Sequence, residues 1–227
     1  MANASILLLR LEGALQSWGE YAKWDIRDTA VLPTKSGIIG LLACALGWER
    51  GDTRITDLYD RIQIAVRADR AGERMTDYHT VTGSPLRTAE GKPRSGGNTL
   101  ISHRQYLQDA SFLVAVQAEE QTIQQLAQAL RSPKWCMYLG RKSCVPSRPI
   151  LEGITDQYTD LLDAVQHYPA AARPVYPMLY ECEKEQPQLA KLHRQDGKPE
   201  GGYRQFVQRP VWRGVIERSG QDVSDKD

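Results

Sequence analysis

The sequence lacks an excess of charge of either sign. Its 227 residues include 29 lysines and arginines against 28 aspartates and glutamates, which gives a formal net charge of +1. Attraction to polyanions through overall charge is therefore excluded, and any contact with nucleic acid has to come from local clusters of cations. The length is sufficient for one large domain or two modest ones with cores of their own.

Cysteine is scarce, and the chain has no long apolar run. The four cysteines form no Cys-x-x-Cys pair, and none of the four histidines stands at zinc spacing, so we expect reduced thiols, no metal site and no cofactor. The apolar run of residues 6–9 is followed at once by Arg10 and Glu12, without a charged leader or a cleavage site. This start predicts neither a signal peptide nor a membrane span, and we expect a cytoplasmic protein.

Three catalytic signatures are missing from the sequence. Val31, Leu32 and Pro33 precede Lys35 where a Walker A loop would need a glycine cradle, so nucleotide hydrolysis is not expected. No carboxylate pair stands at a spacing typical of a metal nuclease, and no Gly-x-Ser-x-Gly elbow occurs.

Hydrophobic patterns along the chain predict an α+β fold. The order of elements is typical of a split βαβ unit, which predicts a ferredoxin-like, RRM-like sheet with one long insertion. We expect an N-terminal domain over residues 1–151, a small β-rich domain over 152–218 and a disordered tail over 219–227. The expected elements are a buried strand at 5–12, a helix at 34–47, a half-exposed strand at 61–69, a strand at 104–118 broken near 108–110, a helix at 119–132, a short helix at 155–169, and strands at 174–183 and 203–218 joined by a polar connection.

The insertion spans residues 71–104 and has little that could form a core. Seven glycines and prolines punctuate it, large apolar residues are few, and basic residues outnumber acidic ones. A connection of this length without a core-forming pattern predicts a functional or mobile loop.

Two segments could bind an anion. Lys35 and Ser36 begin the helix that Thr34 caps, where free backbone N–H groups and the helix dipole favour a phosphate. The alternative is an ordinary capped helix with a solvated lysine. The second segment, residues 131–148, has no acidic residue and five cations, which are Arg131, Lys134, Arg141, Lys142 and Arg148.

The second segment has the features of a phosphate-backbone site. Gly140 would let the backbone approach a ligand closely, Arg141 offers a fork to phosphate oxygens, and Ser143 adds a hydroxyl. Nearby aromatic rings could stack on unpaired bases. The alternative is a solvated basic turn without a ligand.

Aromatic and histidine residues elsewhere are ambiguous from their pattern alone. Trp18, Tyr21 and Trp24 stand in a connecting segment, where tryptophan more often packs locally than binds a base. An acid–base pair for RNA cleavage could use His79 or His103 together with a nearby tyrosine or lysine, although a histidine in a loop is more often not catalytic.

Four ordered segments carry a resemblance to a known family. These are LLLRLEGALQSWG, RDTAVLPTKSGIIGLLACALG, SHRQYLQDASFLVAV and YLGRKSCVPSRP. Together they resemble the CasD family of type I-E CRISPR Cascade subunits, within the repeat-associated mysterious protein (RAMP) superfamily. The resemblance covers roughly residues 5–218.

The resemblance implies a non-catalytic RNA-binding subunit that serves antiviral defence. It would cap the repeat-derived 5′ handle of the mature CRISPR RNA, and a thumb at residues 71–104 would pack against the adjacent Cascade backbone subunit. The large PAM-recognising subunit would dock nearby, target DNA would be contacted only indirectly, and no membrane would be involved. The RNA-binding residues that it implies, with two stacking candidates added, are Trp18, Arg27, Lys35, Ser36, His103, Arg104, Tyr106, Gly140, Arg141, Lys142, Ser143 and Cys144.

Two other functions remain open from the sequence. Type I-C relatives of the family cleave the CRISPR repeat with Tyr, Lys and His, and His79, His103 and Lys92 keep a metal-independent endoribonuclease possible here. A purely structural adaptor is the third class. It predicts that reversing the charge of Arg141 and Lys142 leaves binding of handle RNA intact.

Overall fold

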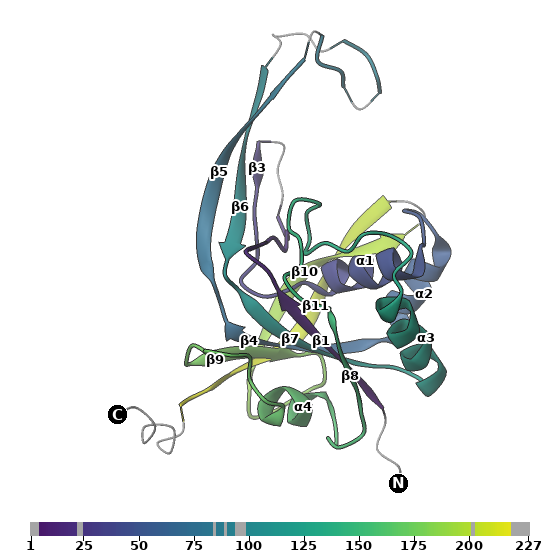
Figure 1. The fold of residues 1–227 in the computed structure, drawn as a ribbon, viewed down its shortest axis with the longest axis vertical. Helices are drawn as coiled ribbons and strands as arrows, with labels where there is room; N and C mark the ends of the chain where they lie inside the picture. Colours follow the sequence, from purple (N-terminus) through teal and green to yellow (C-terminus); the bar gives the residue numbers. More distant parts are fainter. Residues whose placement is uncertain are drawn as a thin grey trace.

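The computed structural model describes residues 5–21, 25–83, 85–88, 90–93, 99–200 and 203–218. Within them the chain is α+β, with a seven-stranded antiparallel sheet and a smaller sheet beside it (Figure 1). The strands of the main sheet are β1 (Ile6–Glu12), β4 (Gln63–Arg70), β7 (Ser111–Gln117), β8 (Leu151–Thr155), β9 (Met178–Cys182), β10 (Ala190–Glu200) and β11 (Tyr203–Ile216).

The main sheet runs in the order β10-β11-β9-β4-β7-β1-β8, and helices cover both of its faces. On one face lie α1 (Lys35–Leu46), α2 (Thr53–Arg61) and α3 (Glu120–Arg131), and on the other lies α4 (Leu161–His167) (Figure 1). Alternate residues of β1 serve the two faces, because successive side chains of a strand point in opposite directions. Leu7 and Leu9 pack toward α1, whereas Ile6 and Leu8 pack toward α4.

Local signals set the bounds of α1 as the sequence predicts. Thr34 caps the helix, since its side chain accepts a hydrogen bond from the Gly37 amide, and Gly47 ends it with a left-handed φ of 73°. The predicted helix is confirmed. The α3 prediction is confirmed as well, over Glu120–Arg131.

Strand β4 differs from its prediction because it is buried on both faces. The sequence favours a half-exposed strand, yet the central residues of β4 are buried without alternation. Its position explains the difference, since β4 lies between β7 and β9 with helices above and below.

The insertion is a two-stranded ribbon and not the expected loop. Strands β5 (Glu73–Thr82) and β6 (Thr99–Gln108) pair antiparallel over ten residues each, and the ribbon projects from the body (Figure 1). Two short strands, β2 (Leu15–Gln16) and β3 (Ile26–Arg27), flank β6 on its other edge. Hydrogen-bonded pairing between β5 and β6 holds the ribbon in shape, because most of its residues are at least partly exposed and lie outside the hydrophobic core.

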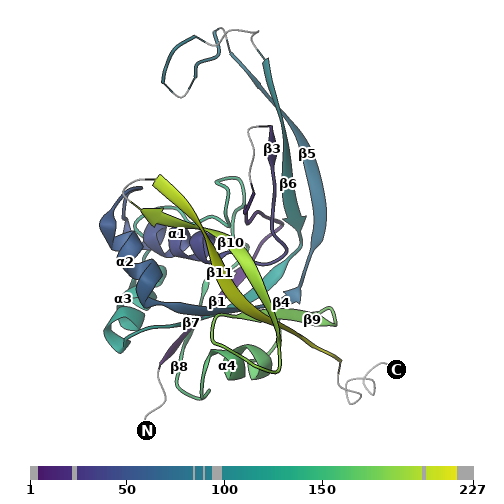
Figure 2. The same ribbon diagram turned by 180° about the vertical axis from the view of Figure 1, so that it is seen from behind.

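The connection expected over residues 183–202 contains β10, which forms a hairpin with β11 that crosses over α1 (Figure 2). Sequence reasoning missed this strand because its side chains are mostly polar. Strand β9 pairs with both β11 and β4, so the sheet runs without a break from the N-terminal to the C-terminal part of the chain. The division at residue 151 stays a prediction, and the expected tail at 219–227 lies outside the described residues.

No helix in the part of the chain that the structure describes is long and apolar enough to cross a membrane.

Candidate nucleic-acid interface

A pocket of about 230 Å³ opens where the base of the ribbon meets the N-terminal end of α1. It brings together residues from five separate segments of the chain. Five of the residues predicted from the sequence to bind RNA lie on its wall, including Arg27, Ser36 and Arg141. The full lining is Ser17, Trp18, Gly19, Glu20, Arg27, Asp28, Thr34, Ser36, Gly37, Gly140, Arg141 and Phe206.

Gly140 allows one loop of the protein to approach another. Its φ is +88°, and a Cβ atom at this position would lie 1.7 Å from the Ser17 carbonyl oxygen. The Ser17 amide donates to the Leu139 carbonyl at 3.1 Å, so the 139–144 loop is fixed against the segment that follows β2. The sequence predicts close approach to a ligand, whereas the structure uses the glycine for internal packing.

Arg141 holds this junction together. Its guanidinium donates to the carbonyl oxygens of Gln105 at 2.8 Å and Arg27 at 2.9 Å, and it lies 4.5 Å from the centre of the Tyr106 ring. These partners are neutral, so the positive charge of Arg141 is not cancelled by them.

Four more cations lie around the junction that Arg141 holds together. They include Arg27 on β3 and Arg104, its register partner on β6. Among the described residues none of these cations forms an ion pair with a carboxylate, whereas the buried Arg10, Arg67 and Arg194 all do. Folding therefore gathers cations that have no ion-pair partner of their own at the base of the ribbon. We call this set the basic cluster: Arg27, Arg74, Arg104, Arg141 and Lys142.

The members of the basic cluster differ in exposure. Arg27, Arg74 and Lys142 are exposed, whereas Arg104 and Arg141 are partly buried. Arg74, which was not a candidate from sequence, donates to the Thr29 carbonyl at 3.2 Å, and Arg104 donates to Ser102 Oγ at 3.2 Å. Ser143 is exposed beside Lys142, whereas Cys144 is fully buried and burial raises the pKa of its thiol.

Lys35 lies inside the protein and not on the interface. Its Nζ donates to the Ile62 carbonyl at 2.7 Å and to Glu183 Oε2 at 3.2 Å, and its side chain is 8% exposed. Burial lowers the pKa of Lys35, an effect that the Glu183 carboxylate opposes. In this structure the ammonium group is directed to internal acceptors, and the phosphate contact expected of it stays a prediction.

The N-terminus of α1 is already occupied by an anionic side chain. Asp196, on β10, accepts hydrogen bonds from the amides of Lys35 at 3.0 Å and Ser36 at 3.1 Å. A carboxylate from 161 residues downstream thus fills the position expected for a phosphate. Ser36 keeps its place on the pocket wall.

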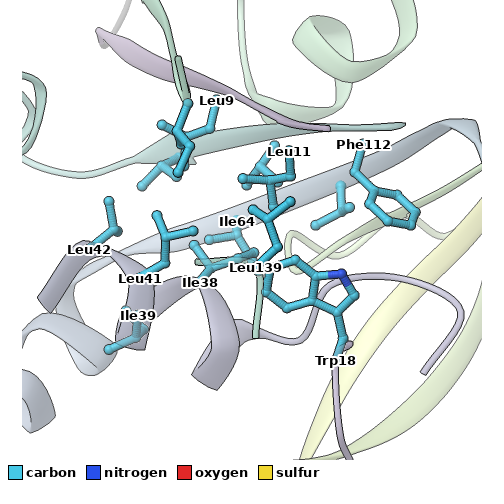
Figure 3. Packing of buried hydrophobic residues seen from close by; sticks show 14 of the residues in the cluster. Leu9, Leu11, Trp18, Ile38, Ile39, Leu41, Leu42, Ile64, Phe112 and Leu139 are labelled. Carbon is cyan, nitrogen blue, oxygen red and sulfur yellow. The ribbon is translucent and has the colours of Figure 1, made fainter. Parts of the chain in front are cut away.

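The two expected stacking residues are covered. Trp18 is 1% exposed and packs in the core among Ile38, Leu139 and Phe112 (Figure 3). Tyr106 is 6% exposed beneath Arg141. Neither ring offers a free face to a base, because both complete the packing under the pocket. Trp24 lies outside the described residues.

The two histidines of the alternative nuclease lie on different sides of the ribbon. His103 faces Tyr78 across the ribbon, with ring centroids 5.5 Å apart, and the residue that follows Tyr78 on its strand, His79, pairs with Ser102. Successive residues of a strand point to opposite faces, so His79 lies on the face away from His103. Lys92 lies in the segment between β5 and β6. The structure thus brings one histidine beside one tyrosine, and the nuclease alternative stays a prediction.

A buried ionic network behind the pocket was missed by sequence reasoning. Arg194 Nε lies 3.0 Å from Glu20 Oε1, and its Nη1 lies 3.6 Å from Glu181. Burial raises the pKa of Glu20, although the Arg194 charge opposes the rise. Arg209 bridges Glu183 at 3.0 Å and Asp196 at 3.1 Å. No local signal could reveal these pairs, since their members come from distant segments.

Comparisons with known proteins agree on one family. The family model described as CRISPR-associated protein (Cas_Cas5) matches residues 6–220. The Cascade subunit CasD of Escherichia coli (strain K12) is 33% identical over 232 residues, which cover 97% of this chain and 99% of the relative. The resemblance to the CasD family is thereby confirmed.

Solved structures give the same result. A chain of a CRISPR RNA-guided surveillance complex has a TM-score of 0.76 and 31% identity, covering 95% of this chain and 92% of the solved chain. A crystal structure of a Cas protein has a TM-score of 0.68 and 32% identity, covering 93% and 95%. With sequence and fold in agreement, the chain belongs to the CRISPR-associated Cas5 family.

Proposed function

We propose that this chain is a non-catalytic subunit of a type I-E Cascade surveillance complex that binds the repeat-derived 5′ handle of the mature CRISPR RNA. The relative from Escherichia coli is a Cascade subunit, and one matching solved chain comes from an RNA-guided complex. Antiviral interference with target DNA would be carried out by the assembled complex.

The observation that carries the proposal is the basic cluster. A chain with a net charge of +1 gathers five cations at one junction, and none of them forms an ion pair among the described residues. Phosphate contacts dominate the affinity of proteins for nucleic acids, and such a cluster supplies them locally. Exposed Arg27 and Lys142 are the members placed to reach phosphates, while Arg141 positions the loop and adds its charge.

The strand order supports a ferredoxin-like N-terminal domain as part of the proposal. Strands β4, β7, β1 and β8 are adjacent in that order with antiparallel neighbours, and α1 and α3 connect them along the chain. This is the arrangement expected of a split βαβ unit. A single strand of RNA would lie along the junction of this domain with the ribbon.

The ribbon β5–β6 is the thumb in this proposal, and its surface supports a protein partner. It exposes several large apolar side chains, which are Tyr78, Val81, Leu100 and Ile101. Exposed apolar groups gathered on one projection are typical of interaction sites. The Cascade backbone subunit would dock there, with the large PAM-recognising subunit nearby.

The test measures binding of handle RNA by the full chain, assembled with its sister subunits, over a series of salt concentrations. Replacing Arg27 and Lys142 by alanine should lower the slope of log affinity against log salt by about 1.4, or about 0.7 for each phosphate that is no longer neutralised. Arg50 and Arg61, exposed cations outside the pocket and the basic cluster, provide a control pair whose replacement should leave the slope unchanged. Equal slopes for both double variants would refute the proposal.

A further inference from the structure

One wall of the pocket is formed by an aromatic ring. The sequence around this residue does not indicate that it binds a ligand. Phe206, on β11, lines the pocket with 57% of its surface exposed. The other phenylalanine of the chain, Phe112, is fully buried in the core. With Trp18 and Tyr106 covered, Phe206 is the aromatic side chain on the pocket wall that keeps a large exposed surface. Such a face binds an unpaired base by stacking.

The pocket wall carries carboxylates as well as cations. Arg27 and Arg141 line it together with two carboxylates, Glu20 and Asp28. A phosphate in the interior would approach both carboxylates, which makes the pocket unsuitable for the backbone of RNA. A base carries no charge and can donate hydrogen bonds, so it suits this lining better.

Asp28 is held in place as an acceptor. Its carboxylate accepts from the amides of Glu20 at 3.2 Å and Tyr21 at 2.9 Å. Glu20 is fixed by its ion pair with Arg194, and its Oε1 is buried away from solvent. A carboxylate accepts from the exocyclic amino group of cytosine, and the amino groups of adenine and guanine offer the same donor. Uracil has no exocyclic amino group, and two carbonyl oxygens flank its N3–H, so this acceptor favours the other bases.

The size of the pocket limits what it can hold. Its volume of about 230 Å³ falls below the ~300–1,000 Å³ of pockets that enclose drug-sized ligands. One base fits this scale, whereas a duplex or a run of stacked bases does not. The hydroxyl-bearing residues Thr34 and Ser36 complete the polar wall.

We propose that this pocket holds the base of one unpaired nucleotide, stacked on Phe206, with its amino group donating to the Asp28 carboxylate and its phosphate beside Arg27. The inference rests on the proposed function and adds a base-selective subsite to it. Such a pocket makes the interface select among the bases at one position of the RNA, with uracil disfavoured there.

The test uses the full chain and fluorescein-labelled octamers of cytidine and uridine, with affinity measured by anisotropy. The two octamers have the same charge and similar size, so they differ chiefly in the amino group. Cytidine should bind about two- to tenfold more tightly, the range expected for one hydrogen bond. Phe206→Ala should weaken cytidine binding by about five- to 150-fold, as expected when one stacked base is released. It should leave the salt slope unchanged, because the Phe206 ring neutralises no phosphate.

Matched variants separate the possible outcomes. Phe206→Tyr keeps the ring and should bind like the natural protein, while Val215→Ala removes an exposed apolar group from the same strand outside the pocket. Equal effects of Phe206→Ala and Val215→Ala, or equal binding of the two octamers, would overturn the base pocket. The proposed function would still stand if the Arg27 and Lys142 variant lowers the salt slope. Thermal unfolding of each variant verifies that it is folded.

Discussion

Replacing Lys35 and Lys142 separately by methionine distinguishes a structural lysine from an RNA-binding one. Lys35 is paired with Glu183 inside the protein, and removing one partner of a buried pair costs about 3–5 kcal/mol. Glu183 keeps Arg209 at 3.0 Å and the Ile64 amide at 2.8 Å. We therefore expect Lys35→Met to lower the free energy of unfolding by an amount at the lower end of this range, about 3 kcal/mol. The corresponding fall in Tm is about 6–12 °C. Lys142→Met should change stability by less than about 0.5 kcal/mol.

For RNA binding the order of the two variants should be reversed, with the larger effect in Lys142→Met. Lys142→Met should lower the salt slope of RNA binding by about 0.7 if it contacts one phosphate, and Lys35→Met should leave the slope unchanged at a temperature where the variant is folded. Calorimetry and salt titrations of the same preparations give both quantities. A Lys35→Met protein with an unchanged Tm and a reduced slope would refute the structural role assigned to this lysine.

Further predictions concern the pocket loop, the ribbon and the thiols. Gly140→Ala should destabilise the protein by more than about 2 kcal/mol, since a left-handed φ and the close approach to Ser17 both oppose a Cβ atom, whereas Gly153→Ala, with open space around it, should be nearly neutral by thermal unfolding. Deletion of residues 83–98 should leave the core folded and weaken docking of the backbone subunit; native mass spectrometry of an unchanged complex would contradict the thumb assignment. In alkylation at pH 8, exposed Cys136 should react first. Burial raises the pKa of Cys182 to about 11, so only about one thiol in a thousand is ionised there, and early labelling of Cys182 would contradict this.

Local patterns were sufficient where a structural feature depends on neighbouring residues. The N-cap at Thr34 and the stop at Gly47 both act within α1, and both predictions are confirmed. The apolar run of β1 is likewise a buried strand. Residue spacing alone specifies such features, because their partners lie within a few positions along the chain.

Features that depend on distant partners could not be predicted. Lys35 is typical of a solvated helix start until Glu183 and Asp196 are brought against it from β10 and the turn that precedes it. The pairing of β5 with β6 gives order to a segment that has no core pattern of its own. Phe206 belongs to a mostly polar hairpin, and its sequence neighbours do not indicate a pocket. The exposed Arg27 and Lys142 stay predicted RNA contacts.

The pairing of β9 with β4 has a consequence for how the chain folds during synthesis. The first half leaves the ribosome with one edge of β4 unpaired and with Lys35 lacking its counter-charge. Both are completed only by residues 178–183. A nascent chain stalled before that point would carry an open strand edge able to pair with other chains. The core around β4 is therefore finished only after β9 has been synthesised, more than a hundred residues later in the chain.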